Sequence, residues 1–304
     1  MFVLVLNASN VVNDGSNNTF VYNFPNSINL TNKYIAVSQI TMYYSWFNID
    51  SKYNNNRLTY SWTVAGVLST FTITIPNGLY NITDINSYCQ FIMIQNGHYL
   101  VNSSGSNVYY FELLVNPNRY AIQINTFLVP TSLPTGFTQP ANFAGYPTQT
   151  FNPIVTIPAT FNKILGYTAG FASNNNINNA YTPPTASQSN NYVTKNGVGT
   201  LSYLSNTYPD VQPNSSIFLS ISNINNPYSQ PSSIIYSITP TVAIGEQIIE
   251  RPPNFMWNKL IDGTYNNIRV QFLGIDKQPV TIQDPNLTIL LTIKDGDEGL
   301  LGNK

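Results

Sequence analysis

Residues 71–95 read FTITIPNGLYNITDINSYCQFIMIQ. In the first five positions Phe71, Ile73 and Ile75 alternate with threonines, which is the period-two pattern of a half-buried antiparallel strand. The next three, Pro76-Asn77-Gly78, are a turn signal. The stretch therefore predicts a strand that ends in a turn before a segment of different periodicity.

That segment predicts a helix from about Asp84 to about Gln95. Thr83 is the expected N-cap, and Asn96-Gly97 suits the left-handed conformation that ends a helix. Apolar side chains recur at the i, i+3, i+4 and i+7 positions of one helix face: Ile85, Tyr88, Cys89 and Ile92. No other stretch of the sequence gives a convincing helical pattern.

Strand patterns dominate the rest of the sequence. β-branched and aromatic residues alternate or cluster between Pro, Gly and Asn punctuation at Phe2–Leu6, Thr19–Phe24, Lys33–Ile49, Leu58–Trp62, Val108–Val115, Tyr120–Val129, Ser216–Ile221, Ser233–Ile238, Ile268–Leu273 and Leu287–Ile293. Core strands thus occur near both ends of the sequence. We expect an all-β fold, a single jelly-roll β-sandwich with one substantial helix.

The middle of the sequence has a different composition. Thr131–Thr150 is rich in Pro, Gly, Thr and aromatic residues, and Ser173–Thr200 is a low-complexity tract of Asn, Ser, Thr and Pro. We expect one jelly-roll domain over residues 1–304, with either long surface loops or a small insertion at about residues 130–215.

Charged residues are scarce. They make up 8% of the 304 residues, against about 25% in ordinary soluble domains, while aromatic residues reach 13%. The 44 asparagines, together with Ser and Thr, predict a neutral hydrogen-bonding surface that can dock against copies of itself. The net charge is −1 and no Lys/Arg run occurs, which argues against specific nucleic-acid binding.

Two further features concern the cellular compartment. Cys89 is the only cysteine, so an internal disulfide is impossible, which fits assembly in a reducing compartment. The apolar N-terminal run is too short for a signal peptide, and no stretch approaches the roughly 18 apolar residues of a membrane span. We expect synthesis in the cytoplasm and no membrane span.

Residues able to carry chemistry are few. His98 is the only histidine, and we expect it to have a structural or surface role after the helix. We expect Cys89 to be a small buried thiol. Asp295-Gly296-Asp297-Glu298 resembles half of a calcium loop but lacks the remaining ligands. The glycines of Gly166–Gly170 and Gly197–Gly199 do not open a helix after a strand, as a phosphate loop requires. We therefore expect no catalytic, cofactor-binding or metal-binding residues.

Four stretches resemble the penton (minor capsid) proteins of mavirus-type virophages and related Polinton-like elements. They are residues 5–12, 72–88, 164–170 and 280–291, and they sample the sequence from its start to near its end. The positions that carry the resemblance are Pro76, Asn77, Gly78, Tyr80, Asp84, Ile85, Asn86, Gly166, Gly170, Asp284 and Pro285.

The resemblance implies a jelly roll that forms homopentamers at the fivefold vertices of an icosahedral capsid. Trimers of a double jelly-roll major capsid protein would surround it, and the family has no catalytic residues or cofactors. The protein would be part of the virion, assembled in the host cytoplasm. The residues themselves indicate a turn at Pro76–Gly78, a favourable charge at a helix start for Asp84, and an extended approach to the last strand at Asp284-Pro285.

Three functions compete on the sequence. A structural oligomer is favoured by the neutral surface and the resemblance. A carbohydrate-binding or host-attachment module is the alternative, because exposed Tyr and Trp with Asn suit sugar recognition. An all-β hydrolase is weakened by the single histidine and the 13 scattered carboxylates, since glycosidase chemistry needs a carboxylate pair.

Overall fold

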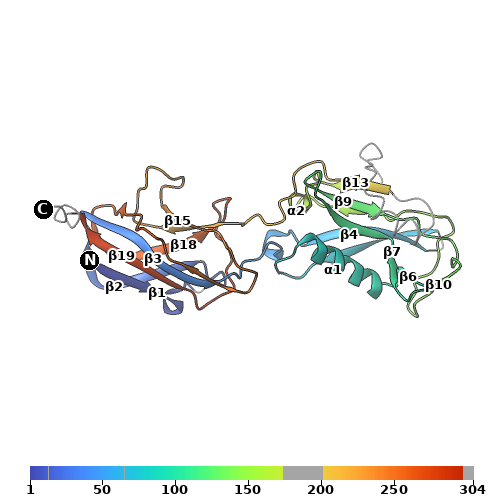
Figure 1. Ribbon diagram of the computed structural model, residues 1–304, viewed down its shortest axis with the longest axis horizontal. Helices are drawn as coiled ribbons and strands as arrows, with labels where there is room; N and C mark the ends of the chain where they lie inside the picture. The colour runs from blue at the N-terminus through green and yellow to red at the C-terminus, as the bar shows by residue number, and fades with distance from the viewer. Residues whose placement is uncertain (13, 65, 174–200, 297–304) are drawn as a thin grey trace. The chain divides into compact units, whose positions relative to one another are not determined.

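The computed structural model describes residues 1–12, 14–64, 66–173 and 201–296. The chain divides into two compact units, coloured by sequence position in Figure 1. The jelly-roll unit consists of Met1–Phe47 and Pro213–Lys304, and the inserted unit consists of Asn48–Gln212. The chain therefore leaves the first unit once and returns to it once.

The jelly-roll unit contains two antiparallel sheets. The first has the order β1 (Phe2–Leu6), β19 (Thr288–Asp295), β3 (Lys33–Tyr43) and β16 (Gln247–Glu250), and β17 (Asn258–Lys259) also pairs with β3. The second has the order β15 (Ile234–Ile238), β14 (Ile217–Ile221), β18 (Thr264–Leu273) and β2 (Thr19–Asn29). A 3₁₀ turn, η1 (Ala8–Asn10), follows β1.

This strand order is that of a jelly roll. If the eight main strands of the unit are counted along the chain, the two sheets read 1-8-3-6 and 5-4-7-2. Two such four-stranded sheets, linked as paired Greek keys, define the fold. The inserted unit lies between the third and fourth of these strands, β3 and β14. The expected jelly roll is confirmed by these connections.

Each sheet buries one of its faces. Leu4 and Leu6 of β1 are buried, whereas Val3 and Val5 on the other face are exposed. In the second sheet Phe20 and Phe272 are buried and meet edge to face, with ring centroids 6.2 Å apart. The alternation matches the period of two that the sequence shows.

The inserted unit contains three smaller antiparallel sheets and a helix. The first sheet has the strand order β12 (Phe171–Ala172), β11 (Val155–Ile157), β4 (Arg57–Val64) and β5 (Val67–Thr74). The second has the order β13 (Leu201–Leu204), β9 (Ala121–Thr126) and β8 (Phe111–Asn116), and the third has the order β10 (Phe137–Thr138), β6 (Tyr99–Asn102) and β7 (Asn107–Tyr109). The helical elements are α1 (Ile82–Gln95), α2 (Asn162–Leu165) and the 3₁₀ turn η2 (Ser51–Tyr53).

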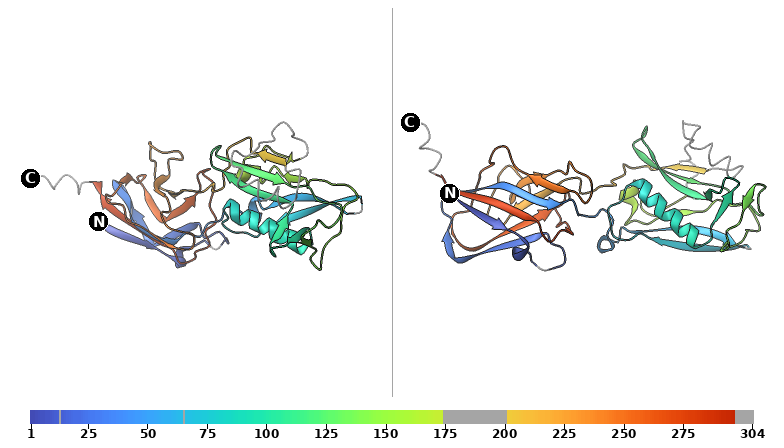
Figure 2. Two further views of the ribbon diagram at one scale, coloured as in Figure 1. Left: turned by 45° about the vertical axis from the view of Figure 1, so that its right-hand side comes forward. Right: turned by 60° about the horizontal axis from the view of Figure 1, so that its bottom comes forward.

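The inserted unit has a hydrophobic core of its own. Helix α1 packs on β8 and lies along the sheets in both views of Figure 2. Ile85, Cys89 and Met93 on its inner face are fully buried in a cluster drawn entirely from residues 49–203. Because this core needs no side chain of the jelly-roll unit, the inserted unit is a domain in the physical sense.

Several expectations are confirmed and some were wrong in detail. Strands take up 44% of the structure and helices 9%, and α1 is the one substantial helix among the described residues. Its N-cap is Asn81, not Thr83, because the Asn81 side chain reaches the backbone of Asp84. The expected strand Lys33–Ile49 ends at Tyr43, and Val108–Val115 is interrupted at Tyr110.

The extent of the insertion differs from the expectation. It begins at Asn48, where we expected an insertion or loops only from about residue 130. Strands β4 and β5 have the same period-two pattern as the jelly-roll strands, so their sequence does not reveal to which sheet they belong. Thr131–Thr150 is largely loop, with a short strand at Phe137–Thr138, and most of Ser173–Thr200 lies outside the described residues.

One expectation concerned membranes. Among the residues that the structure describes, no helix combines the length and the apolar character that a membrane crossing requires.

Candidate functional site

Asn48 ties together the places where the chain enters and leaves the inserted unit. Its Nδ2 donates to the carbonyl oxygens of Val211, at 2.6 Å, and Tyr80, at 2.7 Å. Its Oδ1 accepts from the Tyr80 backbone N–H at 2.9 Å. The side chain is 4% exposed, so these bonds replace its lost contacts with water. We call Asn48, Pro76–Tyr80 and Val211 the root of the inserted unit.

Pro76, Asn77 and Gly78 form the second part of the root. The backbones of Gly78 and Ile49 exchange two hydrogen bonds, of 2.9 and 3.1 Å. The Asn77 side chain accepts from Ser51 N–H and donates to Asp50 Oδ1. A Cβ on Gly78 would lie 2.6 Å from the Tyr80 ring. The expected turn is therefore a bend at Asn77 followed by a bridge to Ile49.

The start of α1 follows directly from the root. Asn81 and Asp84 form a capping box, in which each side chain accepts from the other residue's backbone N–H. Asp84 thus favours the helix start as expected. Ile85 is fully buried, and Asn86 Oδ1 accepts from the Leu113 N–H of β8 at 2.8 Å. These residues fix the helix and its position on the sheet.

Gly166 and Gly170 both adopt φ = +73°. Gly166 ends α2, and a Cβ there would lie 2.5 Å from the carbonyl oxygen of Thr207, whereas Gly170 has open space around it. The Thr207 N–H donates to the Gly166 carbonyl at 2.8 Å. Both glycines lie in turns, and Gly166 also permits close contact with the segment that leads out of the inserted unit.

Asp284 binds the end of strand β3 in the jelly-roll unit. Its carboxylate accepts from the backbone N–H groups of Tyr43, where β3 ends, and Asn286, both within 2.9 Å. Pro285 and Asn286 form a turn between Asp284 and β19. In the same unit the buried Trp46 donates from Nε1 to the Asn214 carbonyl at 2.9 Å.

The positions that carry the family resemblance therefore hold the structure together. Most surround the points where the chain leaves or re-enters one of the units, and none forms an exposed cluster of reactive groups. Asn48 and Trp46, which tie the outgoing and returning segments, were missed in the sequence. The 44 asparagines of the chain gave no local signal for Asn48.

His98 lies in an aromatic cluster of the inserted unit. Its ring stacks on Trp62, with centroids 4.4 Å apart, and its Nδ1 lies 2.8 Å from the Tyr60 hydroxyl. Asn96 Nδ2 donates to that hydroxyl at 2.9 Å, so one ring nitrogen of His98 and one amide share the Tyr60 oxygen. Burial lowers the pKa of His98 to about 4, which keeps it neutral. Of the structural and surface roles expected for His98, the buried position in the core corresponds to the structural one.

Cys89 and Asp295 also make contacts within the fold. Cys89 is fully buried in the core, and burial raises the pKa of its thiol. Asp295 pairs with Lys33, and Asp297 and Glu298 lie outside the described residues. In the part of the chain that the structure describes, no three metal-ligating side chains gather.

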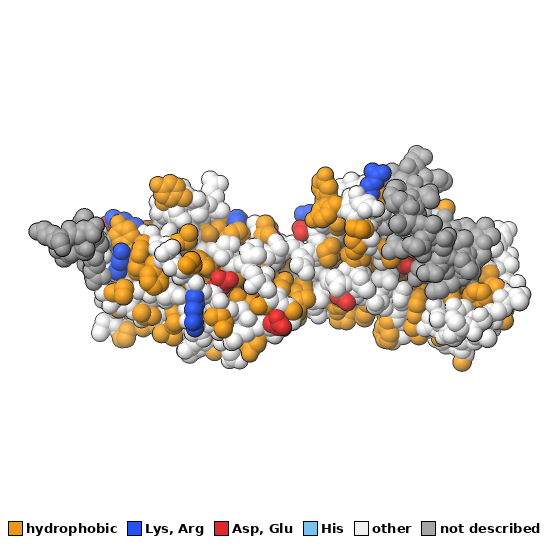
Figure 3. Space-filling view, viewed as in Figure 1, with side chains coloured by type: hydrophobic (Ala, Val, Ile, Leu, Met, Phe, Trp, Pro, Cys, Tyr) orange, Lys and Arg blue, Asp and Glu red, His pale blue; other side chains and the backbone are white. Residues whose placement is uncertain are grey.

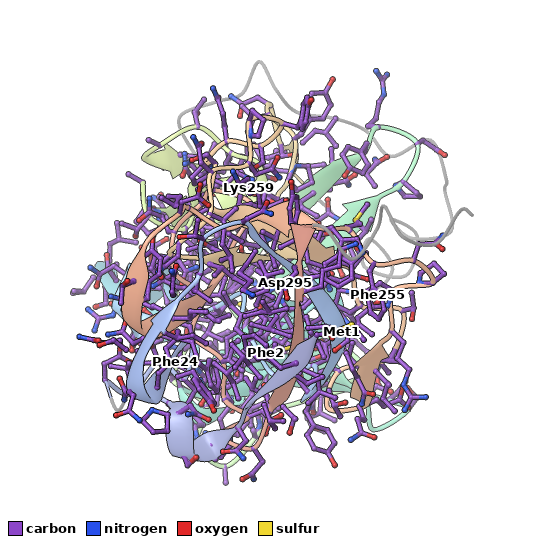
Figure 4. All side chains as sticks on the ribbon, turned by 90° about the vertical axis from the view of Figure 1, so that its left-hand side faces the viewer. Met1, Phe2, Phe24, Phe255, Lys259 and Asp295 are labelled. Carbon is purple, nitrogen blue, oxygen red and sulfur yellow. The ribbon has the colours of Figure 1, made fainter. Side chains whose placement is uncertain are left out.

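The surface is mostly neutral. In Figure 3 charged side chains are isolated among apolar patches and uncharged polar area. The two ion pairs found within the described ranges, Lys33–Asp295 and Lys259–Asp262, belong to the jelly-roll unit. Lys259, Asp295 and Met1 appear at one end of that unit in Figure 4. Of the 25 charged residues of the chain, 9 belong to the inserted unit.

Two exposed tyrosines of the inserted unit lie side by side. Tyr120 is 68% exposed and Tyr208 79% exposed, with ring centroids 5.9 Å apart. Tyr120 follows the turn between β8 and β9 with φ = +49°, a conformation unfavourable for a non-glycine residue. Such strain tends to occur at functional sites. The sequence contained no specific signal for this pair.

The comparison with solved structures gave several similarities. No protein-family model matches the sequence, and no curated protein matches it. The chain is similar to the mavirus penton protein, with 10% identity over 96% of this chain and 98% of that one and a TM-score of 0.39. A chain of the Sputnik virophage structure solved by cryo-EM gives 11% identity, 98% and 99% coverage and a TM-score of 0.34. The jelly-roll assignment rests on the strand connections of this chain itself.

Proposed function

We propose that this chain is a structural virion protein that forms homopentameric pentons at the fivefold vertices of an icosahedral capsid. Its partners would be further copies of itself and trimers of a double jelly-roll major capsid protein. It would be assembled in the host cytoplasm and located in the virion. The observation that carries the proposal is the complete jelly-roll strand order of the first unit, a fold common in capsid proteins.

The surface chemistry supports self-assembly. In a ring of five, each subunit presents one face to one neighbour and a different face to the other. Charged residues are 8% of the chain, so repulsion between identical subunits is small. Exposed apolar side chains such as Val3, Val5 and Ile249 on the first sheet offer area for such contacts. Burial of apolar area contributes about 25 cal/mol per Å² without any charge pairing.

The interior supports a non-enzymatic role. The only histidine and the only cysteine of the chain, His98 and Cys89, are both buried among aromatic or aliphatic side chains. His98 is kept neutral by its lowered pKa, and the Cys89 thiol is kept protonated by its raised pKa. Neither group is placed where a substrate could reach it. The Lys and Arg residues are scattered, which argues against a nucleic-acid partner.

The test is the native mass of the purified protein by light scattering at about 0.1 M and about 1 M sodium chloride. We expect a pentamer at both, because the Debye length falls from about 10 Å to about 3 Å while apolar contacts are unaffected. A monomer at both salt concentrations, well above micromolar protein, contradicts self-assembly. A pentamer that dissociates at 1 M salt contradicts the neutral interface.

A carbohydrate-binding or host-attachment role is the second candidate, favoured by the Tyr120–Tyr208 pair. Exposed tyrosine rings can stack on the apolar face of a sugar, and their hydroxyls can hydrogen-bond to it. Binding to a glycan array that is lost in Tyr120→Ala and Tyr208→Ala would support this role. Exposed Tyr228 of the jelly-roll unit is the matched control, because it is 95% exposed and is not part of the pair.

A further inference from the structure

Strand β5 is an edge strand of the inserted unit. It pairs with β4 along one side over eight consecutive residues without a bulge, and no described strand pairs with its other side. From Val67 to Thr70 its side chains are exposed on both faces of the sheet. This half of the strand therefore extends beyond the core that covers the rest of the sheet.

The register shows which backbone groups are free. Ser61 of β4 lies opposite Thr70, but its N–H donates to the Ile154 carbonyl on the far side of β4, at 2.9 Å. Ser61 and Thr70 are therefore a non-hydrogen-bonded pair of the antiparallel ladder. The N–H and C=O groups of Thr70, and by alternation those of Leu68 and Thr72, point away from β4.

This edge lacks three of the features that usually protect edge strands, namely charges, proline and a bulge. Natural sheets guard such edges with charges, proline, bulges or a covering element. The sequence of β5, Val-Leu-Ser-Thr-Phe-Thr-Ile-Thr, contains no charge and no proline. By contrast, edge strand β2 contains Pro25, and the Leu113 N–H of β8 is capped by Asn86. An unguarded edge rich in β-branched residues is suited to pairing.

The backbone groups and the low charge of the β5 edge indicate what kind of segment can pair with it. Alternating free N–H and C=O groups in an extended strand are matched by another extended strand. Arg57 is the only charged residue on the described part of the β4–β5 hairpin, so a charged partner strand would gain little. A second copy of this chain, with its 8% charged residues, is the matching partner.

We propose that the free edge of β5 pairs with an extended segment of a neighbouring copy and continues the β4–β5 sheet between subunits. The proposal rests on the proposed homopentamer, in which neighbours are held at high effective concentration. Because a ring interface is heterologous, the paired segment belongs to a different part of the neighbour.

Hydrogen exchange of the β5 amides in the assembled protein tests the pairing. We expect the Leu68, Thr70 and Thr72 amides to exchange at least tenfold more slowly in the assembly than in the dissociated chain. The Ser69 and Phe71 amides, which point to β4, should be protected in both states. Equal exchange of Thr70 and Thr72 in the two states overturns the proposal.

A pair of proline variants provides the second measurement. Thr70→Pro removes an outward N–H, and we expect at least a tenfold increase in the dissociation constant of the assembly with the inserted unit still folded. Ser69→Pro is the matched control, because it breaks the β4 ladder and should destabilise the inserted unit itself. Thr70→Lys, which places a charge on the edge without altering the backbone, should weaken assembly like Thr70→Pro.

The outcomes separate this proposal from the proposed function. A pentamer that Thr70→Pro and Thr70→Lys leave unchanged overturns the β5 pairing alone. A dimer that is protected at Thr70 and disrupted by both variants supports the pairing and contradicts the pentamer. A wild-type protein that remains monomeric contradicts both.

Discussion

The two units of the chain are held together in different ways. The jelly-roll unit is defined by long ladders between distant strands, such as the eight-residue pairing of β19 with β3. In the inserted unit the longest ladder joins β4 and β5, which are adjacent in the chain. This unit also depends on individual contacts, such as those of Asn48, Gly166 and His98. We therefore expect many strand pairings to share the stability of the jelly-roll unit, whereas a single substitution can lower the stability of the inserted unit substantially.

Removing the inserted unit gives the largest expected effect. We expect a chain in which a short Gly-Ser linker replaces residues 48–212 to fold as a jelly roll, because all eight of its main strands remain. Trp46 and Asn214 are already joined by a 2.9 Å hydrogen bond, so the linker has little distance to span. Circular dichroism and a cooperative melt check this. An insoluble or non-cooperative product would show that the jelly-roll unit depends on its insertion.

Gly166→Ala and Gly170→Ala test the dependence on single contacts. Both replace a glycine at φ = +73°, which costs about 1 kcal/mol. Only Gly166 places the new Cβ 2.5 Å from a backbone oxygen, and we expect its total cost to exceed about 3 kcal/mol. Chemical denaturation monitored at the inserted unit gives the difference. Equal losses in the two variants would contradict the close contact at Thr207.

Acid should destabilise the inserted unit through His98. The unfolded histidine binds a proton near pH 6.5, but its folded pKa is about 4, so the unfolded state binds more protons between these values. Stability is therefore full above about pH 6.5 and falls as the pH drops towards 4, by about 3 kcal/mol. The jelly-roll unit contains no histidine and lacks this contribution.

His98→Phe is the control for the acid effect. It keeps a ring beside Trp62 but cannot be protonated, so the loss between pH 6.5 and 4 should largely disappear. In a Trp46→Phe, Trp257→Phe background, Trp62 alone reports the unfolding of the inserted unit by fluorescence. An unchanged pH dependence in His98→Phe would assign the effect to carboxylates instead.

The two capping boxes give the smallest effect and the most direct comparison. Asn81→Ala in the inserted unit removes the cap of the 14-residue α1, and we expect a cost of about 1 kcal/mol. Asn7→Ala in the jelly-roll unit removes a similar box from the three-residue η1, which buries no residue. We expect only a few tenths of a kcal/mol there. Thermal melts of both variants measure the difference, and similar losses would contradict the contrast between the units.

The sequence predicted the elements of the fold better than their assembly. Strands and α1 follow from local periodicity, and Asp84 from helix electrostatics. The start of the insertion at Asn48 did not follow, because strand pairing is non-local and β4 resembles a jelly-roll strand. The role of Gly166 as a turn was predictable, but its contact with Thr207 lies 41 residues away along the chain. The free edge of β5 likewise appears only when its neighbours are known.

The pairing of β1 with β19 has a consequence for synthesis on the ribosome. Leu6 pairs with Ile289, so β1 cannot join its sheet until nearly the whole of the described chain has been translated. At about 5–20 residues per second this takes tens of seconds. During that time the apolar run Phe2–Leu6 lacks its partner, while all residues of the inserted unit emerge earlier. We therefore expect the insertion to fold first during translation and the unpaired β1 segment to require protection by chaperones.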